Sequence, residues 1–492
     1  MKYIFTSLLL LLSFYSSAQY SRDKRFFFTL PPDSADIQFY APKKGPQAVA
    51  TVFGINMGVW IFDRFIQKGD FAYINGHTIK ENFRHGFIWD NDRMGTNMFL
   101  HPYHGSLYYN AARSNGYNYW QSGLFSLAGS GMWELFMECE YPSTNDIIAT
   151  PLGGMVLGEV FYRASDLLLD DRAYGSERFG REAIAFMVSP MRGLTRIIHG
   201  DAWRKRATSG RQFGLPPVSI EVSAGIRVLE LQDAVFDQGI GFGSEIRIEY
   251  GDKFEADRGK PYDYFSIKTN LNVQASQPVL GELSIIGRIV GKELLEKEKQ
   301  TLSIGLYQHF DYYDSDTISD ISFKTPYKFC TPASFGGGLF YRNETFKRGL
   351  MEGNFHLNGI LLGASLSDYY RVDERNYNLA NGLSTKVGFS YSSFNQKIRL
   401  GLNSQTYYMF TWKGYPEQMD WEHFNPKTLN AQGDRSRAQL YHSNIRIDYR
   451  LRKNFYLTGD FSSYVRRTYY KYFENVYSST SESKLMLTYR FK

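Results

Sequence analysis

The chain has 492 residues, with 56 Lys and Arg against 50 Asp and Glu, which leaves a net charge of only +6. This charge gives no support for nucleic-acid binding, two cysteines cannot build a disulfide scaffold, and 43% hydrophobic residues exclude a wholly disordered chain. A mean hydropathy of −0.38 excludes a polytopic helical membrane protein, whereas 17% aromatic residues and 44 glycines are typical of a β-barrel with alternating faces.

The amino terminus has the three parts of an export signal. Lys2 precedes an apolar run over residues 8–12, and the small residues Ser16, Ser17 and Ala18 follow it. We therefore predict a signal peptide over residues 1–18, cleaved after Ala18. Residues 19–45 contain Pro31, Pro32 and Pro42 and are interpreted as an extended linker.

Residues 46–210 have a helical periodicity and are predicted to form an α-helical domain. No helix there is predicted to cross a membrane, because the apolar segments 119–138 and 151–169 lack a clean uncharged stretch of about 20 residues. Thr150 and Pro151 are expected to be the N-cap and first residue of one helix. The expected helices cover residues 47–66, 78–87, 101–114, 119–138, 151–169, 179–188 and 190–200.

The candidate site residues are concentrated between residues 101 and 159. His104, Glu134 and Asp146 are the candidate catalytic residues, because carboxyls set among apolar side chains acquire raised pKa values and can exchange protons. His101 and His104, together with Glu134 and Glu138, could alternatively bind a metal. The candidate binding residues are His101, Arg113, Glu138, Ser143, Asn145 and Glu159.

Structural interpretations compete with these roles. Ser143 and Asp146 have the spacing of a helix capping box, and Glu134 could be a buried carboxylate paired with Arg113 or His104. Gly154 and Gly158 are expected to allow close packing against the helix at 119–138. The basic segment 190–211 could meet phospholipid headgroups at the periplasmic rim of a barrel, or could merely connect the two domains.

From residue 215 to 492 the periodicity changes to two, which predicts an outer-membrane β-barrel. Twelve alternating segments begin near residues 217, 240, 261, 278, 299, 334, 353, 381, 396, 438, 454 and 476. An even strand count, short turns alternating with longer loops, and aromatic residues near strand ends are typical of such barrels. Leu485, Leu487, Tyr489 and Phe491 share one face of the last strand, which resembles the C-terminal strand of bacterial outer-membrane barrels.

The inward positions of these strands carry both charges, among them Glu245, Arg446 and Asp448. We interpret them as a lumen filled by ion pairs, with a selective pore as the alternative. Cys139 and Cys330 lie in different predicted domains and are expected to be unpaired.

The stretch from His101 to Glu159 also resembles a known family. The run H-P-Y-H-G-S-x-Y-Y-N-A-A-R, followed by W-E, P-S-x-N-D and G-G-x-x-x-G-E, is similar to an uncharacterised domain-of-unknown-function family of exported proteins. The resemblance implies a helical domain that precedes an outer-membrane barrel, but no reaction. A weaker similarity links His104, Glu134, Ser143, Asp146, Gly154 and Gly158 to VanZ-like envelope proteins.

Together these features predict a cell outer-membrane protein, an α+β membrane protein with a periplasmic helical domain before a twelve-stranded antiparallel transmembrane barrel. The leading functional hypothesis is a role in envelope maintenance or transport, with the helical domain at the periplasmic mouth of the barrel. An enzyme acting on lipid or cell-wall precursor is the alternative, and a passive channel the second alternative. The expected partners are outer-membrane lipid and the barrel-assembly machinery, without nucleic acid, cofactor or metal.

Overall fold

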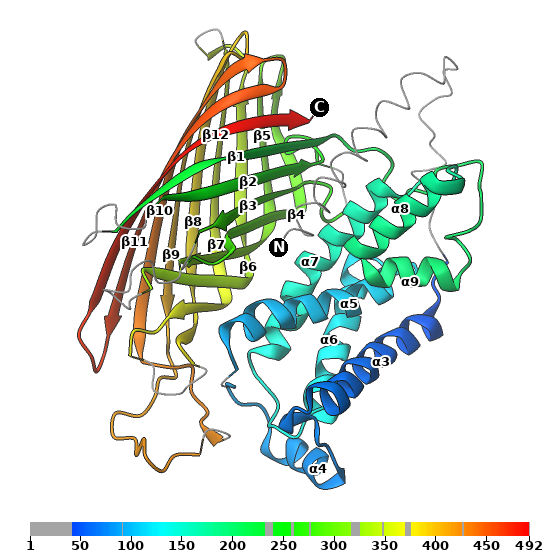
Figure 1. Ribbon diagram of the computed structural model, residues 1–492, viewed down its shortest axis with the longest axis vertical. Coiled ribbons are helices and arrows are strands. Elements are labelled where there is room, and N and C mark those ends of the chain that lie inside the picture. The colour runs from blue at the N-terminus through cyan, green and yellow to red at the C-terminus, as the bar shows by residue number, and fades with distance from the viewer. Residues whose placement is uncertain are drawn as a thin grey trace.

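The structure is a computed structural model that describes residues 42–90, 92–231, 240–256, 260–274, 277–315, 325–346, 349–369, 375–425 and 428–491. The predicted signal peptide and most of the predicted linker lie outside these residues. A bundle of helices stands beside a tall barrel in Figure 1.

The helical part of the chain runs from residue 45 to residue 198. Its elements are α3 (Gly45–Phe62), η1 (Asp63–Gln67), η2 (Asp70–Ala72), α4 (Gly76–His85), η3 (Thr96–Leu100), α5 (His101–Arg113), α6 (Tyr119–Phe136), α7 (Asp146–Leu168), α8 (Gly175–Val188) and α9 (Pro190–Ile198). Asn118 caps α6 by accepting a hydrogen bond from the Gln121 amide, and Asn75 caps α4 in the same way.

The carboxyl half forms a closed antiparallel barrel in which each strand pairs with its neighbour in sequence and β1 pairs with β12. The strands are β1 (Val218–Leu231), β2 (Ile240–Tyr250), β3 (Phe265–Val273), β4 (Leu280–Lys297), β5 (Gln300–Ser315), β6 (Tyr327–Asn343), β7 (Gly349–Leu366), β8 (Tyr377–Ser393), β9 (Ile398–Phe410), β10 (Ser436–Arg452), β11 (Phe455–Tyr470) and β12 (Val476–Phe491).

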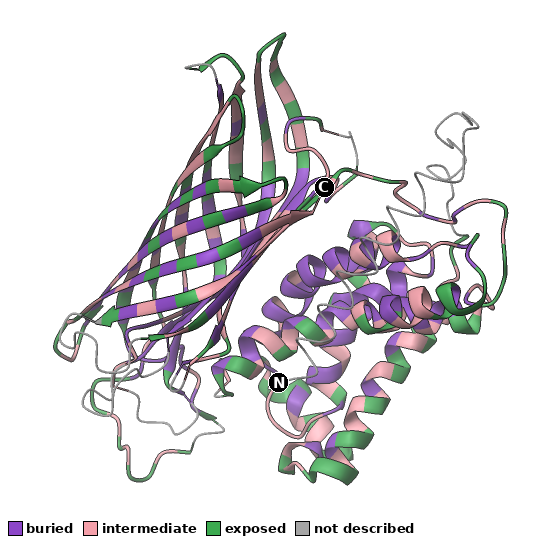
Figure 2. Cartoon of the chain, turned by 45° about the horizontal axis from the view of Figure 1, so that its top comes forward, coloured by how far each residue is buried: buried purple, intermediate pink, exposed green. Residues whose placement is uncertain are grey.

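The barrel confirms the predicted count of twelve strands and their alternation. On β10, Ile445 and Ile447 are exposed, whereas Arg446 and Asp448 are buried in the lumen. The alternation of buried and exposed residues along the strands is visible in Figure 2. An apolar outer wall around a charged interior is the architecture of an outer-membrane barrel.

Helix α7 differs from the prediction at its amino terminus. It begins at Asp146, and Pro151 lies inside the helix, so Thr150 and Pro151 are not the N-cap and first turn. The Asp146 amide donates to Ser143 Oγ (3.1 Å), which supplies half of the predicted capping box. As the sixth residue of the helix, Pro151 lacks the amide that would bond to the Ile147 carbonyl.

The two glycines of α7 pack against α5, and the prediction that they meet the helix at 119–138 is wrong. A Cβ added at Gly154 would lie 2.5 Å from the carbonyl carbon of Gly105, and one at Gly158 would lie 2.6 Å from the ring of Tyr109. The backbones of α5 and α7 therefore touch, which fixes the positions of the side chains at their ends.

The helical part packs against the outer wall of the barrel. One buried cluster joins Met98 and Val156 from the helices to Phe310, Cys330 and Leu362, which point outward from β5, β6 and β7. Gln308, also outward on β5, accepts hydrogen bonds from Tyr119 (2.5 Å) and Tyr262 (3.0 Å) and donates to the Leu152 carbonyl (3.0 Å). The contact is thus with the side of the barrel, beside which Figure 1 shows α5, α6 and α7.

The basic segment before β1 is mostly paired within the protein. Arg192 binds Asp166, and Arg196 binds Asp171 and Glu182 (2.8 Å), all away from solvent. Trp203, Arg204 and Lys205 remain exposed. Cys139 and Cys330 are both free thiols, as predicted.

Candidate functional site

Three titratable side chains converge where helices of the bundle begin or end. His101 starts α5, Glu134 lies in the last turn of α6, and Asp146 starts α7. One ligand atom of each lies within 4.8 Å of the others, and His101 Nε2 is 3.7 Å from Asp146 Oδ1. Glu134 and Asp146 are 1% and 2% exposed, so this acid–histidine cluster lies inside the protein.

Backbone and amide groups hold the two carboxyls in place. Glu134 Oε2 accepts from the Ser143 amide (2.7 Å), and Asp146 Oδ1 accepts from Asn145 Nδ2 (3.0 Å). Ser143 also bridges to Ile88 in a short parallel pairing, which ties the segment before α7 to the segment before η3. Fixed donors of this kind keep carboxyls in one orientation, as a reacting site requires.

Asp90 completes the cluster, although the sequence analysis did not select it. Its carboxyl shares a hydrogen bond with Asp146 and accepts from Asn97 Nδ2 (2.7 Å), while its amide donates to Asn145 Oδ1 (3.1 Å). The signal that could have found it is the acidic run around Asp90 and Asp92, directly before the helical segment that carries His101.

The barrel contributes to this cluster through its long loops. Arg375, between β7 and β8, donates to the Asp90 carbonyl and to the Ala431 carbonyl (2.9 Å). Tyr377 Oη receives a hydrogen bond from Asn97 (2.7 Å) and donates to the Asp92 carbonyl (2.7 Å). The cluster therefore lies at the barrel rim where β7 and β9 end and β8 and β10 begin, and not at the rim where β1 begins and β12 ends.

The environment raises the pKa of some of these carboxyls and lowers that of another. Burial, with a smaller contribution from nearby carboxylates, raises the pKa of Glu134 to about 8, and burial together with the charges of Asp90 and Glu134 raises the pKa of Asp146 well above its usual range. Burial alone would also raise the pKa of Asp90, but the hydrogen bond from Asp146 and the charge of Arg375 hold it below its usual range. At neutral pH the cluster thus combines protonated carboxyls with a carboxylate.

Both histidines are neutral in this environment. Burial lowers the pKa of His101, although the charge of Asp90 opposes the effect, and burial beside His101 lowers the pKa of His104 to about 3. The His104 ring packs tilted against Tyr108 and edge-to-face against Trp133, with ring centroids 4.5 and 5.4 Å away. Of the two histidines, only His101 belongs to the set within 4.8 Å, in place of the predicted His104.

The remaining predicted residues separate into two groups. Glu138 is half-buried and hydrogen-bonded to Glu134, so it extends the cluster toward the surface. Arg113 and Glu159 instead pair with each other (2.9 Å) in a second buried network, where Glu159 also binds Arg163 (2.9 Å). The predicted pairing of Glu134 with Arg113 is therefore wrong.

The acid–histidine cluster also contains a donor set that suits a divalent cation. One imidazole nitrogen and two carboxylate oxygens are ligands of Zn²⁺ and Mn²⁺ sites. Among the described residues, His101, Glu134 and Asp146 would supply these ligands. The expectation that the protein uses no metal or cofactor stays a prediction.

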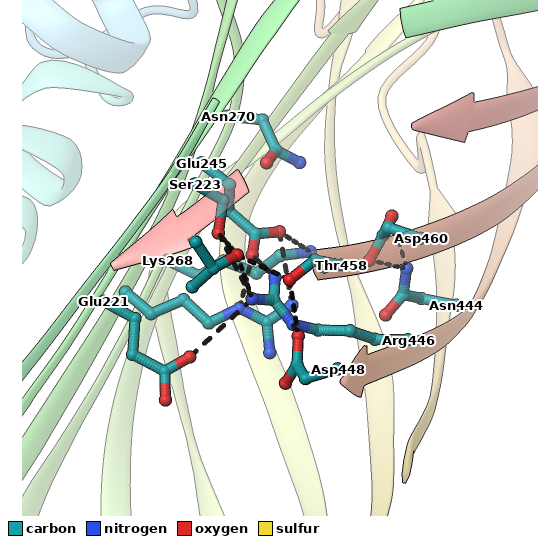
Figure 3. A network of polar contacts seen from close by, with 12 residues as sticks. Glu221, Ser223, Glu245, Lys268, Asn270, Asn444, Arg446, Asp448, Thr458 and Asp460 are labelled. Atoms are coloured by element: carbon teal, nitrogen blue, oxygen red, sulfur yellow. Dashed lines mark hydrogen bonds and ion pairs between the residues drawn. The ribbon is translucent and has the colours of Figure 1, made fainter. Parts of the chain in front are cut away.

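The barrel lumen is filled by paired charges, as predicted. Arg446 binds Glu245 and Asp448 (3.0 Å), and Lys268 binds Glu282 (2.8 Å). Figure 3 shows how this network joins β1 and β2 to β10 through the lumen. A cavity of about 220 Å³ remains beside it, and one of about 760 Å³ lies among the long loops near Tyr415 and Trp421.

Comparison with solved structures finds barrels of the outer membrane at low similarity. The NanC porin has 8% identity and a TM-score of 0.27, with 56% of this chain matching 99% of that one. The toluene transporter TodX from Pseudomonas putida (9% identity, TM-score 0.22, 56% and 90%) and the KdgM porin (8%, 0.23, 56% and 99%) are similar to the same extent.

No curated protein matches the chain. The similarity to VanZ-like envelope proteins therefore stays a prediction. The helical segment does match a family: residues 86–191, which contain Asp90, His101, Glu134 and Asp146, match the model described as Domain of unknown function (DUF3943), so the resemblance seen in the sequence is confirmed for this segment.

Proposed function

We propose that this outer-membrane protein performs acid–base chemistry on a lipid, with the acid–histidine cluster of its helical domain as the site. The observation that carries the proposal is the convergence of His101, Glu134 and Asp146 within 4.8 Å, beside Asp90. Two carboxyls with raised pKa values next to one with a lowered pKa provide an acid and a base at the same pH.

The position of the cluster supports an amphiphilic substrate. Of the three converging residues, His101 is the most exposed, with 14% of its side chain accessible to solvent. The cluster lies at one rim of a membrane barrel, the depth at which lipid headgroups meet water. In the proposed reaction Glu134 or Asp146 donates a proton to a leaving oxygen, and the Asp90 carboxylate accepts one from the attacking group.

The two other functional hypotheses receive less support. Transport or passive conduction through the barrel needs an open lumen, whereas ion pairs such as Arg446–Glu245 cross it. Assembly by the barrel-assembly machinery remains part of the proposal and is supported by the aromatic end of β12. A periplasmic position of the helical domain has no comparable support, because the helices lie along the barrel wall.

Complementation of a deletion strain tests the proposal. We expect Glu134→Gln to lower turnover by roughly 10²–10⁴-fold, as the loss of a proton donor usually does, and to leave the precursor lipid accumulated in extracts. The matched control is Glu81→Gln on α4, whose carboxylate pairs with Arg84 at the surface (3.1 Å). The enzyme hypothesis would be wrong if Glu134→Gln had the same lipid and glycan profiles as the wild type while its barrel was still heat-modifiable on gels.

A further inference from the structure

The outward surface of the helical domain has the polarity of a membrane protein. Every residue of α3 from Gly45 to Phe62 is uncharged, and its buried members include the polar Asn56, while its exposed members are apolar or glycine with few exceptions. The exposed large apolar side chains of α3 and η1 are Val49, Phe53, Ile61, Phe62, Phe65 and Ile66. A water-facing helix would have the opposite arrangement.

Helix α6 has the same arrangement, with polar residues buried and apolar residues exposed. Its serines at 122, 126 and 130 are fully buried, and Ser126 Oγ donates to the Gly105 carbonyl (2.9 Å) inside the bundle. The exposed side of the same helix carries Trp120, Leu124, Leu127 and Phe136. Because α3 and α6 are neighbours, joined by the hydrogen bond from Asn56 Nδ2 to the Gly129 carbonyl (3.2 Å), they form one continuous apolar face.

The length of this face matches a bilayer. The segment Gly45–Gln67 is long and apolar enough to cross a membrane, although only 17% of its most apolar window is buried in the protein. Eighteen residues of α-helix extend about 27 Å, close to the apolar band of about 25 Å on outer-membrane barrels. Charged residues flank α3 at both ends, with Lys43 and Lys44 before it and Asp63 and Arg64 of η1 directly after Phe62.

The helical domain also stands at the same depth as the barrel wall. At one barrel rim, Arg163 of α7 donates to the Pro261 carbonyl (2.6 Å) in the turn between β2 and β3. At the opposite rim, Trp89 packs on Trp412, with ring centroids 6.2 Å apart. Since these contacts reach both ends of the wall, a bilayer around the barrel would meet the helical domain as well.

From these observations we propose that the apolar face of α3 and α6 contacts the acyl chains of the bilayer that surrounds the barrel. The helical domain then lies within the outer membrane beside β5–β7, rather than in the periplasm as the sequence analysis expected. Its apolar face continues the outward apolar belt of the barrel, where Leu361 and Leu383 are about half exposed. This placement does not depend on the chemistry proposed for the acid–histidine cluster.

Spin labels at single cysteines test the placement in the full-length protein, reconstituted at high lipid-to-protein ratio. The background carries Cys139→Ser and Cys330→Ala, and labels are placed by Phe53→Cys on α3 and Leu124→Cys on α6. Leu485→Cys, outward on β12, is the lipid control, and Glu422→Cys, exposed in the loop before β10, is the water control. If labelling at residue 53 disturbs folding, Ala50→Cys on the same exposed face replaces it.

We expect the labels at residues 53 and 124 to behave like the label at 485, with relaxation enhanced more by oxygen than by a water-soluble nickel chelate. A nickel response like that at residue 422 would place the face in water and overturn the proposal. Low accessibility to both reagents would overturn it as well, because a second protein copy and not lipid would then cover the face.

Discussion

At the scale of single residues, the acid–histidine cluster stores protons that an unfolded chain would release. Glu134 keeps its proton up to a pH of about 8, whereas an ordinary glutamate releases it near 4.5. The surrounding groups are Asp90, Asp92, Glu138 and Asp146, with Arg375 and two neutral histidines. The carboxyls outnumber the nearby cations, so a rising pH forces charge repulsion on the folded state.

This imbalance predicts that stability falls as the pH rises. The folded-state pKa of Glu134 lies above its unfolded value, so folding holds more protons between pH 4.5 and about 8, and the free energy of unfolding decreases through that window. The decrease should be on the order of 5 kcal/mol for the helical domain. Thermal unfolding followed by circular dichroism at several pH values measures it.

Glu134→Gln provides the diagnostic comparison. A neutral amide cannot ionise, so we expect this variant to show a flatter pH dependence and to exceed the wild type in stability at pH 8. Glu81→Gln, at a surface pair, should retain the wild-type dependence. If the free energy of unfolding of Glu134→Gln fell with pH as steeply as that of the wild type, a group other than Glu134 would be responsible for the pH dependence.

Three of the four residues of this cluster were among the predicted site residues, and Asp90 was not. Glu134 and Asp146 were predicted because acids inside apolar helices are unusual, and the structure brings them together. The structure places His101, and not His104, within 4.8 Å of both carboxyls. The two histidines differ by less than one helical turn, so only the crossing of α5 and α7 decides which of them faces Asp146. Asp90 was missed because it lies in an irregular segment, where periodicity gives no information.

At the scale of elements, the contact between α5 and α7 positions the two ends that carry His101 and Asp146. The contact is possible because glycines face each other, and a Cβ on Gly154 would lie 2.7 Å from the Gly105 Cα. Backbone atoms cannot move aside as a flexible side chain can. The elements must therefore separate if either glycine gains a side chain.

Gly154→Ala should accordingly destabilise the helical domain by roughly 2–4 kcal/mol, even though alanine is the better helix former. Gly131→Ala on α6 is the matched control, because the nearest atom to its new Cβ is Ile147 Cδ1 at 3.8 Å. We expect that control to be neutral or stabilising by up to about 1 kcal/mol. Chemical denaturation compares the two, and equal effects would contradict the close approach of α5 and α7.

The elements were easier to predict than their packing. Alternation along strands such as β10 is set by the two faces of the barrel wall, so the number of strands followed from the sequence. The start of α7 did not, because Pro151 is a typical first-turn residue and concealed the extra turn from Asp146. The partner of Gly154 was also wrong, since a small-residue spacing indicates close packing without naming the neighbour.

At the scale of the whole molecule, the barrel wall has two different outer surfaces. Most outward positions are apolar and exposed, such as Leu306 on β5, which is 43% exposed. Two residues later Gln308 also points outward but is fully buried, because Tyr119, Leu152 and Tyr262 satisfy its amide. A glutamine in contact with acyl chains would have no such partners.

This contrast predicts whether a substitution at the junction between helices and barrel stabilises or destabilises the protein. Gln308→Leu should destabilise the docked helical domain by about 1–3 kcal/mol, because it leaves the Tyr119 hydroxyl and the Leu152 carbonyl buried without their partner. If this part of the wall met lipid instead, the same change would remove a polar group from the bilayer and stabilise the barrel. Limited proteolysis of the helical domain in reconstituted protein, with the barrel's heat-modifiable gel shift as the folding readout, distinguishes the two outcomes. Leu306→Gln is the matched control on the same strand face: it should weaken the barrel in lipid and leave the proteolysis of the docked helices unchanged.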